Sequence, residues 1–343
     1  MTRPDLSTRW LGLELSSPVV CGAGPVARDP ELARALADAG VSAFVTDSLF
    51  EERILREEGG VMYHYESHAD CDAEATSYQP LRDDLRFGPE EHLAAVQALV
   101  KAVPVPVVAS LNGVTPGGWL RYGRLLQDVG ASAIELNVYD LPDDPRVTAD
   151  QIEARLLAMV RELADDLTIP VSVKLTAFHT SLPNLALRLV QAGAVGVVLF
   201  NRLFEPDIDP EELEAARALT PSRPDELRLR LRWLAVLSGQ GGVDLAASGG
   251  VHDSTGATKA IMAGAHVVQM VSAVLRGGPA SVRSLLDGLS SWMEEKGYDN
   301  LAQLRGCMDV TRCPDPDVYS RANYMDVLHS WHGNLHSFPG DSA

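Results

Sequence analysis

Short apolar runs rich in β-branched residues alternate with longer amphipathic segments along most of the chain. This alternation limits the fold more than any other feature of the sequence. Val195–Phe200 is typical of the short runs, and its almost continuous apolar character is that of a strand buried on both faces. The segments between such runs have the length and period of helices. Strands that alternate with helices form parallel sheets, so we predict an α/β fold.

Eight of the short runs are candidate strands, and their number predicts how the sheet closes. They are Pro18–Cys21, Ala43–Thr46, Pro106–Ser110, Ala133–Asn137, Val171–Leu175, Val195–Phe200, Val243–Ala247 and His266–Met270. Eight strands with helices between them fit a closed barrel better than an open sheet, and barrels of this kind reach 343 residues as one unit. We therefore predict a single (β/α)8 TIM barrel over residues 1–343, with its core at about 8–298, a C-terminal extension at 299–343 and long loops at the C-terminal face.

Three stretches interrupt the alternation. Residues 50–88 lack a clear period, and we expect a long loop with a broken helix there. Residues 201–225 are predicted to form a second long loop that contains a short helix at Pro210–Ala218. Leu227–Arg232 alternates leucine with arginine, and this period of two indicates a short strand or ribbon on a solvated face, followed by a helix at Trp233–Leu237.

The net charge of −18 and the pI of about 4.8 limit the classes of partner. Such a chain repels phosphate backbones and anionic lipid, so we expect no nucleic-acid and no membrane partner. An anionic substrate would need a locally positive pocket. No apolar run reaches the length of about 18 residues that a membrane helix needs, and the polar N-terminus carries no signal peptide, which predicts a cytoplasmic location.

Metal sites lack their usual sequence signatures. The cysteines have no C-x-x-C spacing, so we expect free thiols rather than zinc or iron–sulfur ligands; they are Cys21, Cys71, Cys307 and Cys313. The histidines nearest the predicted strand ends do not form a ligand cluster either; they are His179, His252 and His266. We therefore predict no metal.

Polar and small residues follow the predicted strands at the end where barrel enzymes build their sites. These residues are Ala23, Gly24, Ser48, Asn112, Asn137, Asp140, Lys174, Asn201, Ser248, Gly249, Gly250 and Ser272. Because all eight strand ends meet at one mouth, we expect three asparagines and one lysine to converge there. Amide groups suit the edge of a heteroaromatic ring, although asparagines at strand ends are also ordinary turn residues.

The run Ser248-Gly249-Gly250-Val251 indicates a phosphate site. Glycines let the backbone approach an anion closely, and a helix that begins at Ser254 would add backbone N–H groups. Barrels commonly bind phosphate after strands seven and eight. The alternative is a tight turn that needs glycine only for its dihedral angles.

Lys174 ends an otherwise apolar strand, where lysine is rarely buried without a partner. It could bind an anionic cofactor, form a Schiff base with a phosphorylated metabolite, or extend to solvent.

Several of these runs occur in the same order in a known family. They are Leu11–Leu15 with Ser17-Pro18, Ser110-Leu111-Asn112-Gly113, Glu135-Leu136-Asn137, Val173-Lys174-Leu175, Ser248-Gly249-Gly250-Val251 and Gly264–Gln269. As an ordered set over about residues 8–298, they resemble the FMN-dependent dihydroorotate dehydrogenases. Ser48–Glu52, Asn201–Asp207 and Arg321–Met325 resemble the bacterial dihydroorotate dehydrogenase-like branch most closely.

The resemblance implies an oxidoreductase that acts on CH–CH groups of a small molecule, in pyrimidine biosynthesis. It implies FMN at the barrel mouth, with the phosphate on Gly249, Gly250 and Ser272 beside Ser248. It also implies ring contacts from Ala23, Gly24, Ser48, Asn112, Asn137, Lys174 and Asn201. The lysine would stabilise the anionic reduced ring.

Four positions depart from the family pattern. Asp140 stands where the family has its catalytic cysteine or serine, and the second asparagine of that motif is missing. Asp47 replaces a lysine and Val271 a glycine. We therefore expect Asp140 and Lys174 to be the catalytic candidates and dihydroorotate to be a poor substrate. A non-catalytic partner subunit is the other alternative, and a homodimer or a redox partner protein stays open.

Overall fold

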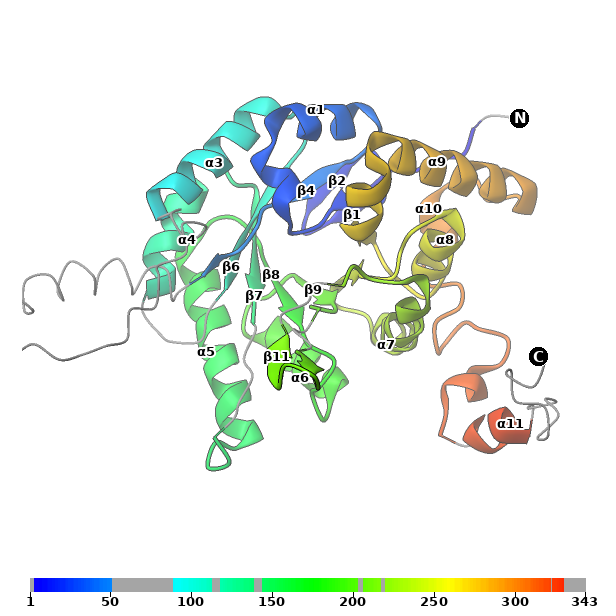
Figure 1. The fold of residues 1–343 in the computed structure, drawn as a ribbon. Helices are drawn as coiled ribbons and strands as arrows, with labels where there is room; N and C mark the ends of the chain where they lie inside the picture. Colours follow the sequence, from blue (N-terminus) through cyan, green and yellow to red (C-terminus); the bar gives the residue numbers. More distant parts are fainter. Residues whose placement is uncertain are drawn as a thin grey trace, which may run out of the picture.

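The computed structural model describes residues 3–50, 89–112, 118–138, 144–202, 206–216, 220–321 and 323–329. Most of the predicted irregular stretch at 50–88, and Asp140, lie outside these residues. Eight parallel strands close into a barrel as predicted, because the strand that begins at Ala43 pairs both with the first strand and with the one that follows it in the barrel (Figure 1). In chain order they are β3 (Val19–Cys21), β4 (Ala43–Val45), β6 (Val107–Asn112), β7 (Ala133–Asn137), β8 (Val171–Leu175), β9 (Gly196–Leu199), β12 (Asp244–Ser248) and β13 (Val267–Met270). The two-residue β5 (Leu49–Phe50) adds to β6.

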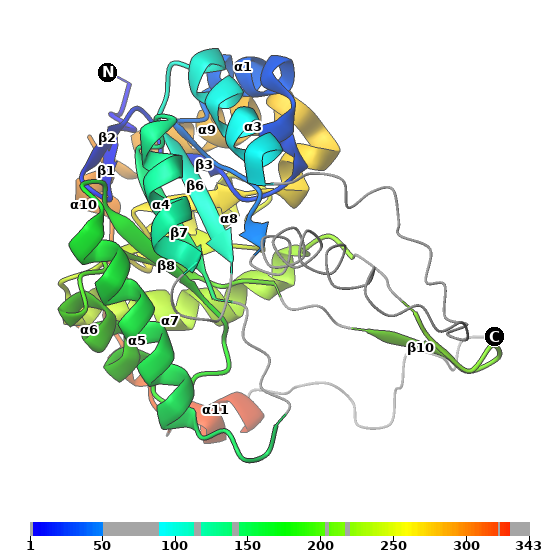
Figure 2. The same cartoon turned by 90° about the vertical axis from the view of Figure 1, so that its left-hand side faces the viewer.

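Helices surround the barrel (Figures 1 and 2). The long ones are α1 (Pro30–Asp38), α3 (Pro89–Ala102), α4 (Gly118–Asp128), α5 (Ala149–Asp166), α6 (Leu182–Gln191), α7 (Leu227–Gln240), α8 (Ser254–Met262) and α9 (Ser272–Lys296). The short ones are η1 (Pro25–Arg28), η3 (Pro224–Glu226), α10 (Leu301–Leu304), η4 (Pro316–Tyr319) and α11 (Asn323–His329).

Helix α5 illustrates why these segments are helical. It begins at a capping box, in which Thr148 and Gln151 each accept a hydrogen bond from the backbone of the other, at 3.3 and 2.8 Å. Its buried side chains recur at helical spacing and form one stripe against the barrel; they are Leu156, Met159, Val160 and Leu163. Along the helical part of the chain that the structure describes, no helix is long and apolar enough to cross a membrane.

A hairpin of β1 (Thr8–Trp10) and β2 (Leu13–Leu15) closes the N-terminal end of the barrel. Trp10 and Leu11 are almost completely buried, in a cluster with the first residues of several strands. The fit is tight, since a Cβ added at Gly196 would lie 2.4 Å from Leu11 Cδ2. The Leu11 backbone N–H donates to Asp244 at 2.7 Å, and Asp244 lies 3.3 Å from His266 Nε2.

Two predicted elements are wrong. Leu227–Arg232 is the start of helix α7, not a strand or ribbon. Leu227, Arg230 and Leu234 are buried on one side of this helix at spacings of three and four, so the alternation of leucine and arginine conceals a helical face. The solvated face that we predicted for this run is also wrong at Arg230, which is 6% exposed.

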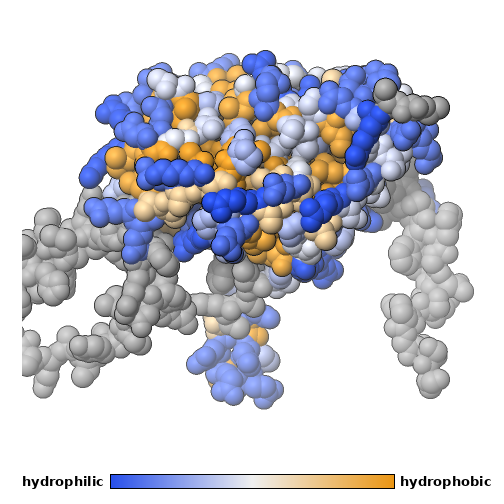
Figure 3. Space-filling view, turned by 90° about the horizontal axis from the view of Figure 1, so that it is seen from above, coloured by the Kyte–Doolittle hydropathy of each residue, from blue (hydrophilic) through white to orange (hydrophobic). Residues whose placement is uncertain are grey.

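The helix predicted at Pro210–Ala218 is an antiparallel hairpin of β10 (Asp207–Asp209) and β11 (Glu214–Ala216). Ile208 and Leu213 are exposed, so the segment has no buried stripe to stabilise a helix. The hairpin extends away from the barrel (Figure 2). On the body of the molecule, seen from above the view of Figure 1, apolar residues lie between hydrophilic ones (Figure 3).

Candidate functional site

Three polar side chains meet inside the barrel near its C-terminal end. Lys174 Nζ on β8 lies 3.4 Å from Glu135 Oε1 on β7 and 3.5 Å from Gln269 Oε1 on β13. Gln269 Nε2 donates to the other oxygen of Glu135 at 2.6 Å. Lys174 is 5% exposed, so the alternative in which it extends to solvent is wrong. A buried cation with a fixed carboxylate and amide is a suitable group to hold an anionic ligand.

A chain of hydrogen bonds links the polar residues at the ends of four strands. Asn201 Nδ2 donates to Asn137 Oδ1 at 2.8 Å, and Asn137 Nδ2 donates to Ser48 Oγ at 3.2 Å. Ser48 and Ser110 share a hydrogen bond of 2.8 Å between their hydroxyls. Asn112 is buried and lies beside Asn137 in the register of β6 and β7. These bonds orient the amide of Asn201. Among the hydrogen-bonded residues just named, Asn201 is the one that lines the cavity described next.

A cavity of about 350 Å³ at the barrel mouth brings together most of the predicted cofactor residues. Those that line it are Ala23, Gly24, Lys174, Asn201, Ser248, Gly249 and Ser272. Ser48, Asn112 and Asn137 are not among the lining residues, although Asn137 accepts a hydrogen bond from Asn201 of the wall, and Gly250 packs against the backbone of Leu227. The volume is within the range of small-molecule sites, about 300–1,000 Å³.

The glycine loop after β12 needs its glycines for two reasons. Gly249 and Gly250 have backbone φ angles of +88° and +83°, which residues with a side chain rarely adopt. A Cβ on Gly250 would also lie 2.5 Å from the Leu227 nitrogen. The tight-turn explanation therefore holds for Gly250, whereas Gly249 also borders the cavity.

Arg230 fixes this loop and lines the same cavity, and the sequence analysis missed it. Its Nε donates to the Ser248 carbonyl at 2.9 Å and its Nη1 to the Glu226 carbonyl at 2.7 Å. Burial lowers the pKa of Arg230 from its ordinary value, against the attraction of Glu226. A buried guanidinium that holds the loop backbone gives Gly249 a defined position at the cavity wall.

The N-termini of α8 and α9 differ in the charge that their caps provide. Asp253 caps α8 and accepts a hydrogen bond from the Gly256 N–H at 2.8 Å, which brings a negative charge to that N-terminus. Helix α9 begins at Ser272 with no side-chain cap and no acidic residue in its first turn. Ser272 and Leu275 of that turn line the cavity, so the N-terminus of α9 is also suited to an anion.

The structure also locates two of the departures from the family pattern. Asp47 accepts a hydrogen bond from Arg28 Nε at 3.1 Å, and this bond raises the pKa of Arg28. The charge of Asp47 is therefore compensated by a neighbour outside the cavity wall. Val271 does line the cavity, and its methyl groups lie against the Gly22–Gly24 loop, within 2.9 Å of a Cβ built on Gly22.

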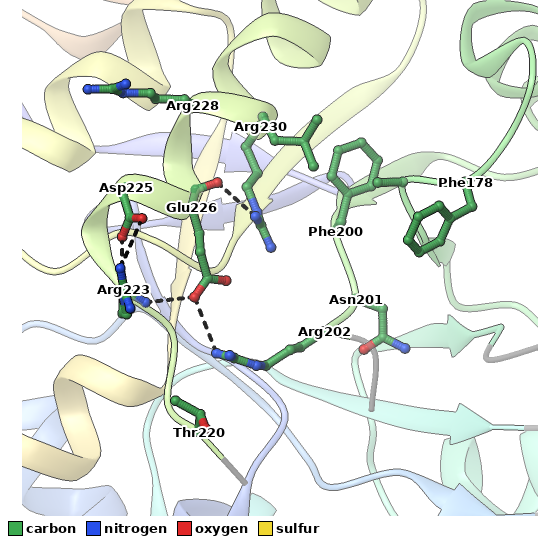
Figure 4. A pocket seen from close by; sticks show the side chains of 12 residues that line it. Phe178, Phe200, Asn201, Arg202, Thr220, Arg223, Asp225, Glu226, Arg228 and Arg230 are labelled. Carbon is green, nitrogen blue, oxygen red and sulfur yellow. Dashed lines mark hydrogen bonds and ion pairs between the residues drawn. The ribbon is translucent and has the colours of Figure 1, made fainter. Parts of the chain in front are cut away.

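A second cavity, of about 630 Å³, adjoins the first and shares half of its lining with it (Figure 4); the shared residues are Phe200, Asn201, Arg202, Thr220, Glu226 and Arg230. Its other lining residues follow β8 or lie in η3, at the N-cap of η3 and at the start of α7. Neither the sequence patterns nor the family resemblance predicted this cavity.

Comparison with known proteins gives relatives along almost the whole chain. A putative dihydroorotate dehydrogenase A (fumarate) of Aeropyrum pernix is 27% identical, over 89% of this chain and 98% of its own length. The catalytic subunit of dihydroorotate dehydrogenase B (NAD(+)) of Pelobacter propionicus is 25% identical, over 90% of this chain and 99% of its own. The chain is a relative of the dihydroorotate dehydrogenases.

A further relative is named for a different activity. The NAD-dependent dihydropyrimidine dehydrogenase subunit PreA of Escherichia coli is 21% identical, over 94% of this chain and 83% of its own length. No protein-family model matches the chain. The predicted resemblance is thus confirmed at the level of the family, and the names of the relatives agree with the predicted enzyme class, a dehydrogenase.

Proposed function

We propose that the protein is an FMN-dependent oxidoreductase that acts on a small carbonyl-bearing substrate, as its dihydroorotate dehydrogenase relatives imply. The observation that carries this proposal is the cavity of about 350 Å³ in which buried Lys174, Gly249 and the start of α9 line one space. A fixed cation, amide groups and free backbone donors suit a flat cofactor with an anionic tail.

The residues have separate roles in this proposal. FMN, when bound, supplies a ring that takes a hydride from the substrate and passes electrons on. Ala23, Gly24, Lys174 and Asn201 would hold the ring, with Ser48, Asn112 and Asn137 as the polar groups linked to them. Ser248, Gly249 and Ser272 would hold the phosphate, on the turn that Gly250 permits. Lys174, held by Glu135 and Gln269, offers positive charge to the edge of the ring.

The oxidation of a CH–CH group also needs a base for the second hydrogen. Asp140 is our candidate on sequence grounds, and it lies outside the residues that the structure describes. An ordinary carboxylate, with a pKa near 3.9, is a weak base for a C–H proton. A positioned base typically contributes 10²–10⁴-fold, so we expect dihydroorotate to react at least ~100-fold more slowly than with a competent family member.

The first test is the visible absorption spectrum of the purified protein. We expect the bands of noncovalent flavin, or their appearance after FMN is added, with FMN released on denaturation. Because Val271 lies against the Gly22–Gly24 loop, partial occupancy agrees with the proposal. Colourless protein that has no affinity for added FMN would contradict it.

The second test is anaerobic mixing of FMN-loaded protein with dihydroorotate while flavin bleaching is followed. We expect slow bleaching. Rapid bleaching that Asp140→Ala abolishes would show that Asp140 is an efficient base. Rapid bleaching that survives this substitution would show that another group takes the proton.

Borohydride trapping separates the alternative function, in which Lys174 forms a Schiff base with a phosphorylated metabolite. Only a Schiff base leaves a reduced covalent adduct on the lysine. Relatives named as subunits support a protein partner for this chain as well. A non-catalytic subunit would purify with that partner and would turn over no substrate with any electron acceptor.

A further inference from the structure

The hairpin of β10 and β11 is acidic and extends away from the barrel (Figure 2). Residues 207–216, which we call the acidic arm, contain five carboxylate side chains and no lysine or arginine. Every side chain of the arm whose position is described is exposed. Among the residues that the structure describes, the hydrogen bonds of the arm all join parts of the arm to each other. The arm therefore lacks a partner within this part of its own copy.

The acidic arm also carries two large apolar side chains, Ile208 and Leu213, which are 74% and 87% exposed. Leu213 lies at the turn with a backbone φ of +55°, in the left-handed region that leucine rarely adopts. A hairpin of two strands is only marginally stable in water on its own. Covering these side chains would stabilise the hairpin, so the arm has the character of a binding element.

A groove of about 880 Å³ between α7 and the segment of η4 and α11 has the opposite charge. Two arginines line it, Arg232 and Arg321, and no carboxylate is among its described lining residues. Val318, Tyr324 and Met325 line it as well, and each is more than half exposed. We call this the basic groove. It offers cations beside uncovered apolar groups, and this is the complement of the arm.

The two arginines of the basic groove differ in how they are held. Arg232 Nη1 donates to the Tyr319 carbonyl at 2.9 Å, and its guanidinium lies 5.8 Å from the centre of the Trp233 ring. Arg321 is exposed, and its side chain has no ion pair with a residue that the structure describes. One guanidinium is thus fixed in the groove, and the other is available to a carboxylate.

Within one copy the acidic arm and the basic groove lie apart. In both views the hairpin and α11 are on separate parts of the molecule, so the arm does not occupy the groove of its own copy (Figures 1 and 2). Both surfaces belong to runs that the sequence analysis singled out: Asn201–Asp207 leads into the arm, and Arg321–Met325 lines the groove. The oxidoreductase function assigns no role to the second run.

We propose that the acidic arm of one copy binds in the basic groove of a second copy. In a two-fold dimer this contact occurs twice, since each copy offers one arm and one groove. Opposite charges bring the two surfaces together, and the apolar side chains of the arm pack against Tyr324 and Met325. The proposal goes beyond the oxidoreductase function, and neither surface lines the cofactor cavity. Its test is therefore independent of the flavin tests.

Sedimentation velocity of the purified protein over a range of concentrations tests this contact by charge reversal. Glu214→Arg reverses a charge of the arm and Arg321→Glu one of the groove, both at exposed side chains. Each should raise the dissociation constant of the dimer roughly 10-fold or more, because like charges then face each other. Glu214→Arg also brings the net charge closer to zero, so overall repulsion cannot cause its effect. Glu162→Arg and Arg161→Glu make the same changes of charge at exposed positions of α5 and should leave association unchanged.

An equimolar mixture of the two reversed variants decides whether the arm and the groove contact each other. In a mixed dimer the reversed arm meets the reversed groove, and the native arm meets the native groove. We therefore expect the mixture, and also the double variant Glu214→Arg/Arg321→Glu, to regain most of the lost affinity. Wild-type protein that stays monomeric at every concentration would overturn the proposal. A dimer that both reversals leave intact, or a mixture that does not associate, would overturn it as well.

Discussion

The two ends of the barrel are built from the same strands but have opposite character. The N-terminal end is closed by Trp10, Leu11 and Leu15, which pack on the small apolar residues that begin the strands. The C-terminal end contains the buried group of Lys174 and Glu135, and two cavities. Apolar burial contributes stability in proportion to area, whereas buried polar groups need specific partners. One end of each strand thus contributes mainly to stability and the other mainly to binding.

The comparison predicts that substitutions at the N-terminal end change stability without changing ligand binding. Weaker ligand binding by a folded variant of that end would contradict this division.

Trp10→Ala should have the largest effect on stability. Trp10 is completely buried, and its removal leaves a cavity at the base of the barrel. We expect a loss of about 3–5 kcal/mol in the free energy of unfolding, measured in urea, with flavin affinity of the remaining folded protein unchanged. Leu187→Ala, at an exposed position of α6, should stay within about 0.5 kcal/mol. Weaker flavin binding by folded Trp10→Ala would show that the two ends are coupled.

Lys174→Met should affect both stability and binding, because it leaves Glu135 buried without its cation. The expected cost is about 3 kcal/mol of stability, and flavin affinity should fall roughly 10–150-fold. Lys101→Met, at the exposed end of α3, should be nearly neutral in both assays. The double variant Lys174→Met/Glu135→Gln should regain stability but not flavin affinity. Equal flavin titrations for the lysine variants would refute the role of Lys174.

Gly196→Ala should cost about 1–3 kcal/mol of stability by overpacking the base. Its Cβ would lie 2.4 Å from Leu11 Cδ2 and 3.3 Å from the Asp244 carbonyl. Since the first contact is with the end of a side chain, Leu11→Ala in the same protein should recover part of the loss. A double variant in which the two costs simply add would show that the clash with Leu11 is not the cause.

The pH dependence of stability should contain a contribution from His266 at the base. Burial, and then repulsion from Arg305, lowers the pKa of His266 from 6.5 to about 4 against the attraction of Asp244, and its Nδ1 accepts a hydrogen bond from the Leu245 N–H. Between these values the unfolded chain binds a proton that the folded protein does not. Stability should therefore fall as the pH decreases from about 6.5 to about 4, by at most roughly 1.4 kcal/mol per pH unit.

His266→Gln tests this contribution, because carboxylates titrate in the same range in both proteins. The difference in unfolding free energy between wild type and variant should change across this window and stay constant above pH 7. A constant difference at every pH would show that His266 does not titrate differently in the folded protein.

The strand ends could be predicted from the sequence because buried strands carry continuous apolar runs, and the residues after them must meet at one mouth. Lys174, Asn201 and Gly249 were found in this way. Glu135 and Gln269 also interrupt apolar runs. Because such groups are seldom buried without partners, these interruptions could have predicted that each contacts another polar group. Their contact with each other across the barrel depends on the closure of the sheet, so it could not be predicted from the sequence of either strand alone.

Arg230 and the second cavity could not be predicted in this way. Within Leu227–Arg232 every second residue is an arginine, and only the start of the helix after Glu226 decides which of them turns inward. The cavity itself depends on how that turn lies against the ends of β8 and β9. Such packing is set by the tertiary structure and overrides the local period.

The hydrogen bond between Arg3 and Asp287 joins positions 284 residues apart, and β3 pairs with β13 across a similar separation. The segment at the start of the chain therefore leaves the ribosome long before its neighbours in the barrel exist. At about 5–20 residues per second, that interval is roughly 15 seconds to one minute. During this time the apolar side chains of the hairpin around Trp10 have no barrel strands to pack against. A chaperone that protects nascent chains should therefore raise the yield of folded protein most when it acts on the Trp10 hairpin before the last strands of the barrel are synthesised.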